Sequence, residues 1–586
     1  MTSLQTAALP TDHIRGPVRP PGSSRPARNG FLLWVLEGLV ALGASLLMTA
    51  LARFVHLDPM SRIGQVSGLA ALQLQLVLLL GLVLVVCLPA MRRWPEAPLR
   101  FAAAAVAGLA SGVVAAGVSL ALRDTFWPLY AQGGDSGTLQ AWAGALMHGR
   151  PLDGAYPPVF PHLVAWTAEA FTGGDVGYAM KLLSLLFTGL LGPVAYLAWR
   201  LLLPPLWALG VGVTASLPMM QPYKPYTTLV LVALVPVLGK LVQLLQRSKE
   251  LPRRRAAWQG AGLGLVIGLL FVLYSGWFVW SALGVVALTA LVLVRVRKDG
   301  GTRALVTAAT TLAVTTAVFL AVAGSYLVRM LGSAGSTVDR YCYFDTYVEP
   351  TYFAMWRDDL PGTDAWSTWP IPGELGGVGL FSVVLLAGLG FALALGINRA
   401  SVLVTAACAA SALLMRYWYA SHMERDQAVM LYPRTSAQLL YCTLVLVGLA
   451  GYLAAQRYGA RRDAAGGAAP VRAFPRLTPR AVATGALCAL GLLYGMAGSA
   501  TADRFMPTTQ TDTGHLALAS QTTESLNGHC SKYAPNNKCS KPGDLSGRLV
   551  QGPDQGTLGC SPNDPFPVRP KASGALRSVL TTLSAG

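Results

Sequence analysis

The chain has 586 residues, of which 53% are apolar and 12% charged, and its formal net charge is +18. Apolar runs of about 20 residues recur along it, the length that crosses the hydrocarbon core of a bilayer, so a soluble multidomain protein is excluded. A membrane β-barrel is also excluded, because its strands would alternate polar and apolar residues. The sequence therefore predicts an all-α polytopic membrane protein.

The positive charge lies in short stretches beside the apolar runs, for example at Arg92 and Arg93 and at 253–255. Cytoplasmic loops of membrane proteins carry such clusters. The excess charge is therefore explained by topology, and nucleic-acid binding is excluded as the main function.

We predict about 13 transmembrane helices. Residues 1–30 form a disordered cytoplasmic arm, 31–100 a two-helix module, 101–500 the transmembrane core, and 501–586 a small extracytoplasmic tail. The predicted spans are 31–55, 66–90, 101–122, 176–200, 203–219, 226–246, 257–275, 277–295, 304–328, 375–397, 401–416, 436–456 and 481–500.

This order places the N-terminus and every basic cluster in the cytoplasm of a multi-pass cell-membrane protein. The apolar segment 157–172 is short, and we place it as a helix at the interface. Four segments then lie outside: 123–175, 331–374, 417–435 and 501–586.

Four cysteines fall in these outer segments, an even number that fits disulfides in an oxidising compartment. The pair Cys530–Cys539 is favoured. Sequence leaves the connectivity with Cys342 and Cys560 open, and unpaired thiols are the alternative.

Asp135 follows an apolar run and begins an amphipathic helix expected on the outer membrane surface. It could accept backbone N–H bonds as a helix cap, or act as a general base for a sugar hydroxyl at the membrane face. Asp175 stands in an equivalent place before the next apolar run, where capping is the favoured interpretation.

The second outer segment mixes aromatic and acidic residues, which suits stacking on sugar rings with hydrogen bonds to their hydroxyls. An interfacial aromatic belt is the alternative. Asp358 and Asp359 leave a divalent cation open, but no metal site or cofactor is implied. The candidate sugar-binding residues are Asp345, Tyr347, Glu349, Tyr352 and Trp356.

The third outer segment holds Arg416 and Arg434 at a membrane face where arginine is unusual. A guanidinium suits a lipid phosphate, and Lys224 in QPYKPY is expected in the same plane. Ion pairs with Glu424 and Asp426 are the alternative. His422 is interpreted as structural or as a sugar contact.

Three motifs, AYPPVF, YFDTYVEPTYFAM and MLYPRTSAQLLYC, resemble the galactan 5-O-arabinofuranosyltransferases of actinobacterial cell walls. The resemblance runs from about residue 101 to 500. It implies a C-superfamily glycosyltransferase fold, an inverting pentosyltransferase, and decaprenyl-phosphoryl-arabinofuranose as donor to a galactan acceptor.

The resemblance also implies roles. Asp135 would take the acceptor proton, with Asp175 as the alternative acid, and Arg434, then Arg416 and Lys224, would bind the donor phosphate. Tyr156 in AYPPVF and His422 join the expected sugar contacts.

Two other functions remain open. A related polyprenyl-phosphate hexosyltransferase would use the same residues, because sugar choice depends on a few pocket contacts. A lipid or sugar transporter would instead place ionisable residues near the midplane of repeated halves. Most acids here fall in outer segments, which favours the transferase over a transporter or a wall-assembly scaffold.

Overall fold

The computed structural model describes residues 28–91, 96–152, 154–333, 380–426, 431–464, 479–509 and 512–542. Within these ranges every regular element is helical, and the only β contact is an isolated bridge between Thr523 and Ser540. Nine of the described helices are long and apolar enough to cross a membrane. The prediction of an all-α polytopic membrane protein is confirmed at that level.

The first part of the bundle is built around α3 (Glu96–Ala121), whose residues are almost all buried. Its contacts are with α1 (Arg28–Leu51), α2 (Arg62–Ala90), α6 (Val176–Trp199) and α15 (Pro479–Asp503). Small residues make this possible, since a side chain at Gly108 would collide with the backbone carbonyl of Ala41. Close backbone approach through Gly and Ala is a common way for helices to pack in lipid.

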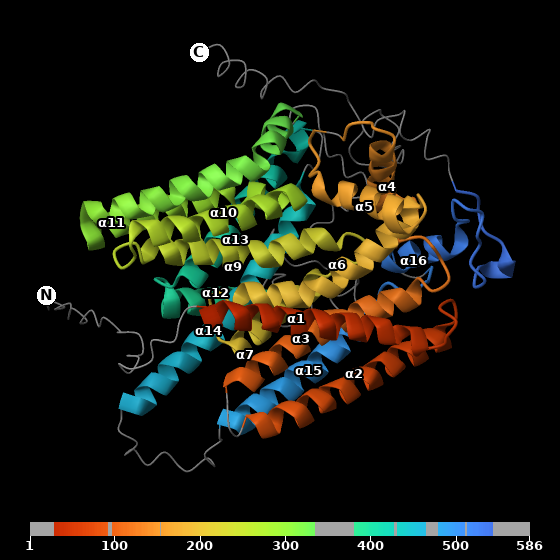
Figure 1. The fold of residues 1–586 in the computed structure, drawn as a ribbon, viewed down its shortest axis with the longest axis horizontal. Coiled ribbons are helices and arrows are strands. Elements are labelled where there is room, and N and C mark those ends of the chain that lie inside the picture. Colours follow the sequence, from red (N-terminus) through yellow and green to blue (C-terminus); the bar gives the residue numbers. More distant parts are fainter. Residues whose placement is uncertain are drawn as a thin grey trace, which may run out of the picture.

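The second part is centred on α9 (Pro225–Gln246), which is nearly as buried as α3. It contacts α6, α10 (Arg253–Leu273), α11 (Gly276–Ser333) and α13 (Ala400–Asp426). Helix α14 (Tyr432–Ala464) packs against α13 and α12 (Leu380–Gly396). Figure 1 shows these helices running broadly alongside one another, with α1, α2, α3 and α15 on one side of the molecule.

Two predicted spans, 277–295 and 304–328, are joined in α11, whose backbone breaks at Gly301 with φ +64° and ψ −166°. A side chain at this φ would be strained, so glycine allows the reversal between the two halves. The predicted span 203–219 is an irregular apolar helical stretch, Pro205–Met219. It contains a six-residue π-helical segment, Ala208–Val213.

A buried ion pair ties α1 to the core. Glu37 is 1% exposed, and its carboxylate accepts from Arg200 at 2.9 Å and from the hydroxyl of Tyr196 at 3.1 Å. Arg100 lies 3.8 Å from the same carboxylate. The two-helix N-terminal module is therefore packed into the bundle rather than attached beside it.

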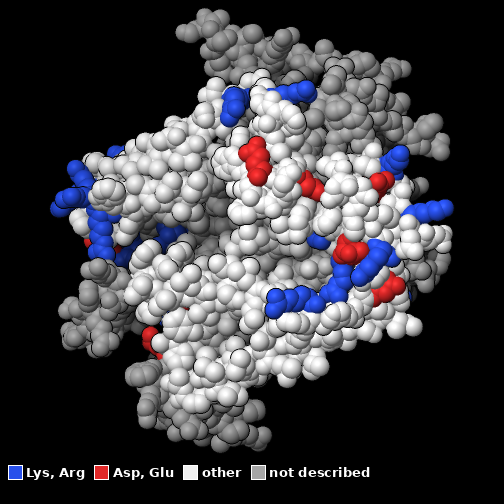
Figure 2. Space-filling model, turned by 45° about the vertical axis from the view of Figure 1, so that its right-hand side comes forward, with Lys and Arg blue, Asp and Glu red and all other residues white. Residues whose placement is uncertain are grey.

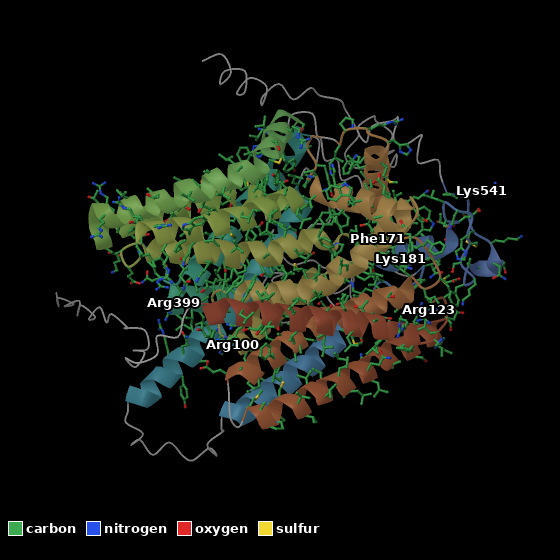
Figure 3. The ribbon with its side chains drawn as sticks, in the orientation of Figure 1. Arg100, Arg123, Phe171, Lys181, Arg399 and Lys541 are labelled. Carbon is green, nitrogen blue, oxygen red and sulfur yellow. A yellow bond between two sulfur atoms is a disulfide. The ribbon has the colours of Figure 1, made fainter. Side chains whose placement is uncertain are left out.

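The short helices α4 (Gly134–Met147), α5 (Val159–Phe171) and α16 (Asp512–Thr522) gather at one end of the bundle (Figure 1). Lys181 and Lys541 lie toward this α4 end, whereas Arg100 and Arg399 lie toward the opposite, basic end (Figure 3). At 13 residues, α5 is too short to cross a hydrocarbon core. Leu139 and Ala143 on the apolar face of α4 are buried against the protein.

Candidate active site

The segment that leads from α3 to Asp135 has a strained backbone. Asp124, Tyr130 and Ala131 have φ of +62°, +75° and +43°, and Gly134 has φ of +50°. Non-glycine residues seldom adopt such angles, and clusters of them occur where surrounding contacts hold a functional loop in place. We refer to residues 122–134 as the Asp135 loop.

The tail supplies many of these contacts. The amide of Tyr130 donates to the carbonyl of Leu516 at 2.6 Å, and the hydroxyl of Thr125 donates to the carbonyl of Ser520 at 2.7 Å. The indole of Trp127 donates to the carbonyl of Glu524 at 3.3 Å. The described part of the tail, 512–542, therefore packs onto the Asp135 loop.

A disulfide closes this part of the tail. Cys530 and Cys539 are bonded, as predicted, while Cys342 and Cys560 lie outside the described residues. Beside the bridge, the amide of Lys532 donates to the carboxylate of Asp124 at 3.0 Å. The disulfide-bonded segment thus reaches one of the strained residues directly.

Lys181 of α6 supports the loop from the other side. Its ammonium donates to the carbonyls of Leu122 and Thr125 at 2.9 and 2.6 Å. These carbonyls follow the last turn of α3, where a cation complements the helix dipole. Lys181 therefore has a structural role, because its hydrogen bonds hold the start of the Asp135 loop.

Asp135 is the second residue of α4, and its side chain does not cap the helix. The N-cap is Gly133, which has no side chain to donate or accept. The Asp135 carboxylate instead accepts a hydrogen bond from the Lys224 ammonium at 2.8 Å. Lys224 side-chain exposure is 8% and Asp135 side-chain exposure is 48%, so the pair joins a buried cation to an accessible anion.

Arg434 lies close enough to act on the same carboxylate. Burial alone would raise the pKa of Asp135, but the ammonium of Lys224 and then the guanidinium of Arg434 lower it below its ordinary value. Asp135 is therefore ionised at neutral pH. Asp135 and Lys224 are in contact and Arg434 lies within electrostatic range of the carboxylate; we refer to these three residues, from separate parts of the chain, as the charged triad.

Lys224 remains protonated although it is buried. Burial lowers its pKa, but the neighbouring Tyr156 oxygen and Asp135 carboxylate more than offset this, and the pKa is raised above its ordinary value. A permanent positive charge next to an exposed carboxylate is suited to an anionic ligand that approaches from the open side.

Aromatic rings form the floor next to the triad. The hydroxyls of Tyr156 and Tyr226 are hydrogen-bonded, Tyr226 stacks on Phe160 at 4.1 Å, and Trp142 packs on Tyr156 at 4.3 Å. Burial raises the pKa of Tyr156, so its phenol is neutral. Phe160 and Tyr226 are fully buried and support the others from below. Trp142 and Tyr156 are half-buried, and aromatic rings of this kind can stack on sugars.

Arg416, on α13, is buried against the start of α14. Its guanidinium donates to the hydroxyl of Ser436 at 2.5 Å and lies 4.0 Å from the ring centre of Tyr432. These contacts hold the helical turn that carries Arg434. A part for Arg416 in binding phosphate remains a prediction.

The other candidates either make other contacts or lie outside the described residues. Asp175 is the N-cap of α6 and accepts from the amide of Tyr178 at 2.8 Å, so the capping interpretation is confirmed. His422 stacks on Trp418 at 4.1 Å and bonds within α13. The residues that lie outside the described range are Asp345, Tyr347, Glu349, Tyr352, Trp356, Asp358 and Asp359, together with the side chains of Glu424 and Asp426.

Within the described residues no group of three His, Cys, Asp or Glu side chains could hold a metal ion. The charged triad itself carries two cations and one carboxylate, a set that fits an anion rather than a cation.

Sequence reasoning missed the contributions of Tyr223 and Tyr226. Both flank Lys224 in QPYKPY, and that motif was the available signal. Tyr226 is fully buried and Tyr223 is half-buried beside the triad, and burial raises the pKa of Tyr223. Proline–aromatic motifs before a helix are common enough that the spacing alone could not distinguish a site from a turn.

Comparison of the chain with models of known protein families and with curated proteins gives no match.

Proposed function

We propose that the protein is an inverting glycosyltransferase that uses a polyprenyl-phosphate sugar. The observation that carries this is the charged triad, in which an accessible carboxylate stands beside two cations at one end of a membrane bundle. A lipid-linked phosphodiester needs cations at headgroup depth, and an attacking hydroxyl needs a base within hydrogen-bond reach.

In the proposed reaction the acceptor hydroxyl oxygen attacks the anomeric carbon while its proton passes to the Asp135 carboxylate. The bond between that carbon and the phosphate oxygen breaks, and its electron pair leaves with the polyprenyl phosphate. Lys224 and Arg434 stabilise the charge that develops on this leaving group. Attack on the face opposite the phosphate inverts the anomeric centre.

Binding of the donor also prepares the base. In the free protein the Lys224 ammonium makes Asp135 a weak base, because it stabilises the carboxylate. A donor phosphate competes for Lys224 and brings negative charge, and both effects raise the proton affinity of Asp135. The carboxylate thus becomes more basic when the sugar is in place.

The sugar itself is proposed from the motif resemblance. AYPPVF contributes Tyr156 to the aromatic floor, and MLYPRTSAQLLYC contributes Arg434 to the triad. On that basis we propose arabinofuranose as the transferred sugar and cell-wall galactan as the acceptor. The α4 end would then face outward, with about 13 spans in a C-superfamily arrangement.

The test is to incubate the purified protein with radiolabelled polyprenyl-phosphate sugars and a set of acceptors. Wild-type protein should transfer pentose, and Asp135→Asn should lower kcat by about 10²- to 10⁴-fold, the usual contribution of a general base. Asp175→Asn is the matched control, because asparagine caps helices as well as aspartate does. Near-normal turnover by Asp135→Asn would rule out its role as base.

A further inference from the structure

A cavity lies at the basic end, where α9 finishes, α10 begins and α11 breaks at Gly301. Its volume is about 740 Å³, and the residues lining it include Lys249, Arg253, Arg303 and Gly300. A second recess of about 390 Å³ shares Lys249 and Gly300 with it and extends toward α12. Ligand-sized cavities in proteins typically measure about 300–1,000 Å³, so the first is large enough for a headgroup.

The α11 break shapes this cavity. A side chain at Gly300 would lie 2.6 Å from the Cβ of Ala304 and 3.2 Å from the Cβ of Lys249. Glycine therefore lets the backbone pass close to the segment that follows α9. Lys249 and Arg253 are close in sequence, and the reversal of α11 brings Arg303 to the same cavity.

The same cations have no acidic partner. Among the residues that the structure describes, Lys249, Arg253 and Arg303 form no ion pair, whereas Arg247 nearby pairs with Glu250 at 3.3 Å. Of the described residues that line the larger cavity, Glu250 is the only acid, so that this lining carries three positive charges and one negative charge. Charge at the end of a membrane span can serve topology alone, but topology does not require a shared cavity.

We propose that this cavity binds a phosphate group, and that the phosphate belongs to the headgroup of an anionic membrane lipid. Two arginines and a lysine around one space match the oxygens of a phosphodiester, for which guanidinium groups are well suited. The cavity lies at the start of α10 and at the break in α11, where apolar helical segments end, and lipid headgroups are expected at the ends of such segments. Figure 2 shows Lys and Arg gathered at the edge of the molecule where α11 lies. This site is at the opposite end of the bundle from the charged triad and does not depend on the proposed transferase activity.

The test measures binding of phosphatidylglycerol and of phosphatidylcholine to purified protein in detergent by native mass spectrometry. The site variant is Arg253→Gln with Arg303→Gln, and the matched control is Arg254→Gln with Arg255→Gln. The control removes the same charge from the same end of the protein, at residues that do not line the cavity. We expect saturable phosphatidylglycerol binding that weakens at least tenfold in the site variant and stays within twofold in the control.

A second arm adds inorganic phosphate. If phosphate at millimolar concentration protects the wild-type protein from thermal unfolding while phosphatidylglycerol does not bind, the site takes soluble phosphate, and the lipid assignment is wrong. If phosphatidylglycerol binding weakened equally in both double variants, the lipid would be held by general charge attraction, and the proposed binding site would be wrong. Unchanged binding in the site variant would overturn it as well.

Discussion

The contact between Asp135 and Lys224 determines the charge of both side chains and, under the proposed function, the basicity of the Asp135 carboxylate. Their ion pair keeps the carboxylate ionised and the buried ammonium protonated. The Asp135 pKa is below its ordinary value in the free protein, so the carboxylate loses its charge only as the pH falls through that lowered value. Under the proposed function, a bound donor phosphate would shift the same pKa upward.

The pH dependence of turnover follows from this. The acid limb of kcat/KM reports the free protein, and that of kcat reports the substrate complex. We expect the acid limb of kcat to lie at higher pH than that of kcat/KM, measured from initial rates over a pH series. Coincident limbs, or the reverse order, would contradict a donor that competes for Lys224.

Arg434 is expected to act on the donor rather than on the acceptor. Its replacement by alanine removes a charge-assisted hydrogen bond, about 1.5–3 kcal/mol, and should raise the KM for the donor by roughly 10- to 100-fold. The KM for the acceptor should change by less than about twofold. Arg457→Ala is the control, because Arg457 lies on the same helix and donates to the carbonyl of Leu395 instead.

At the scale of elements, the tail and the Asp135 loop behave as one unit. The loop residues Asp124, Tyr130 and Ala131 have strained backbones, and the tail donates or accepts hydrogen bonds along the whole segment. Strain of this kind persists only while neighbouring contacts hold it. Loss of the tail's internal bridge should therefore loosen the approach to Asp135.

Replacement of Cys530 and Cys539 by serine tests this. We expect hydrogen exchange of residues 123–134 to accelerate and kcat to fall by about tenfold, since small misplacement of a reacting group is costly. The KM for the donor should change little. Cys87→Ser, on α2, is the control, because Cys87 forms no disulfide. Unchanged exchange in the double variant would show that the bridge does not hold the loop.

At the scale of the whole molecule, Glu37 joins the first helix to the centre of the bundle. In its pair with Arg200, the Glu37 carboxylate is 1% exposed and the arginine side chain 11%, so the pair is almost completely shielded from solvent. Removing one partner of a buried pair leaves the other charge without compensation, which is usually far more costly than losing an exposed pair.

Glu37→Ala should therefore lower the free energy of unfolding by about 3 kcal/mol, measured by thermal or denaturant unfolding in detergent. Glu250→Ala breaks an exposed pair with Arg247 and should cost at most about 1 kcal/mol. Equal losses in the two variants would mean that the α1 contact contributes little to stability.

The sequence alone determined the membrane class, the position of most spans, the capping by Asp175 and the Cys530–Cys539 pair. These depend on local quantities: the length of an apolar run, a cap residue beside its helix, and two cysteines separated by 9 positions. The two helices predicted at 277–295 and 304–328 are also found, on either side of the backbone break at Gly301.

Only the tertiary structure decided that Asp135 pairs with Lys224, that Arg434 joins them, and that the tail holds the loop. Asp135 and Lys224 are 89 residues apart, and Thr125 and Ser520 are 395 apart. Such pairs form because several helices pack in one order, and no local pattern carries that order. The position of Asp135 in the sequence was equally consistent with helix capping. The structure excludes capping, because Gly133 is the N-cap of α4 and the Asp135 carboxylate accepts a hydrogen bond from Lys224 instead.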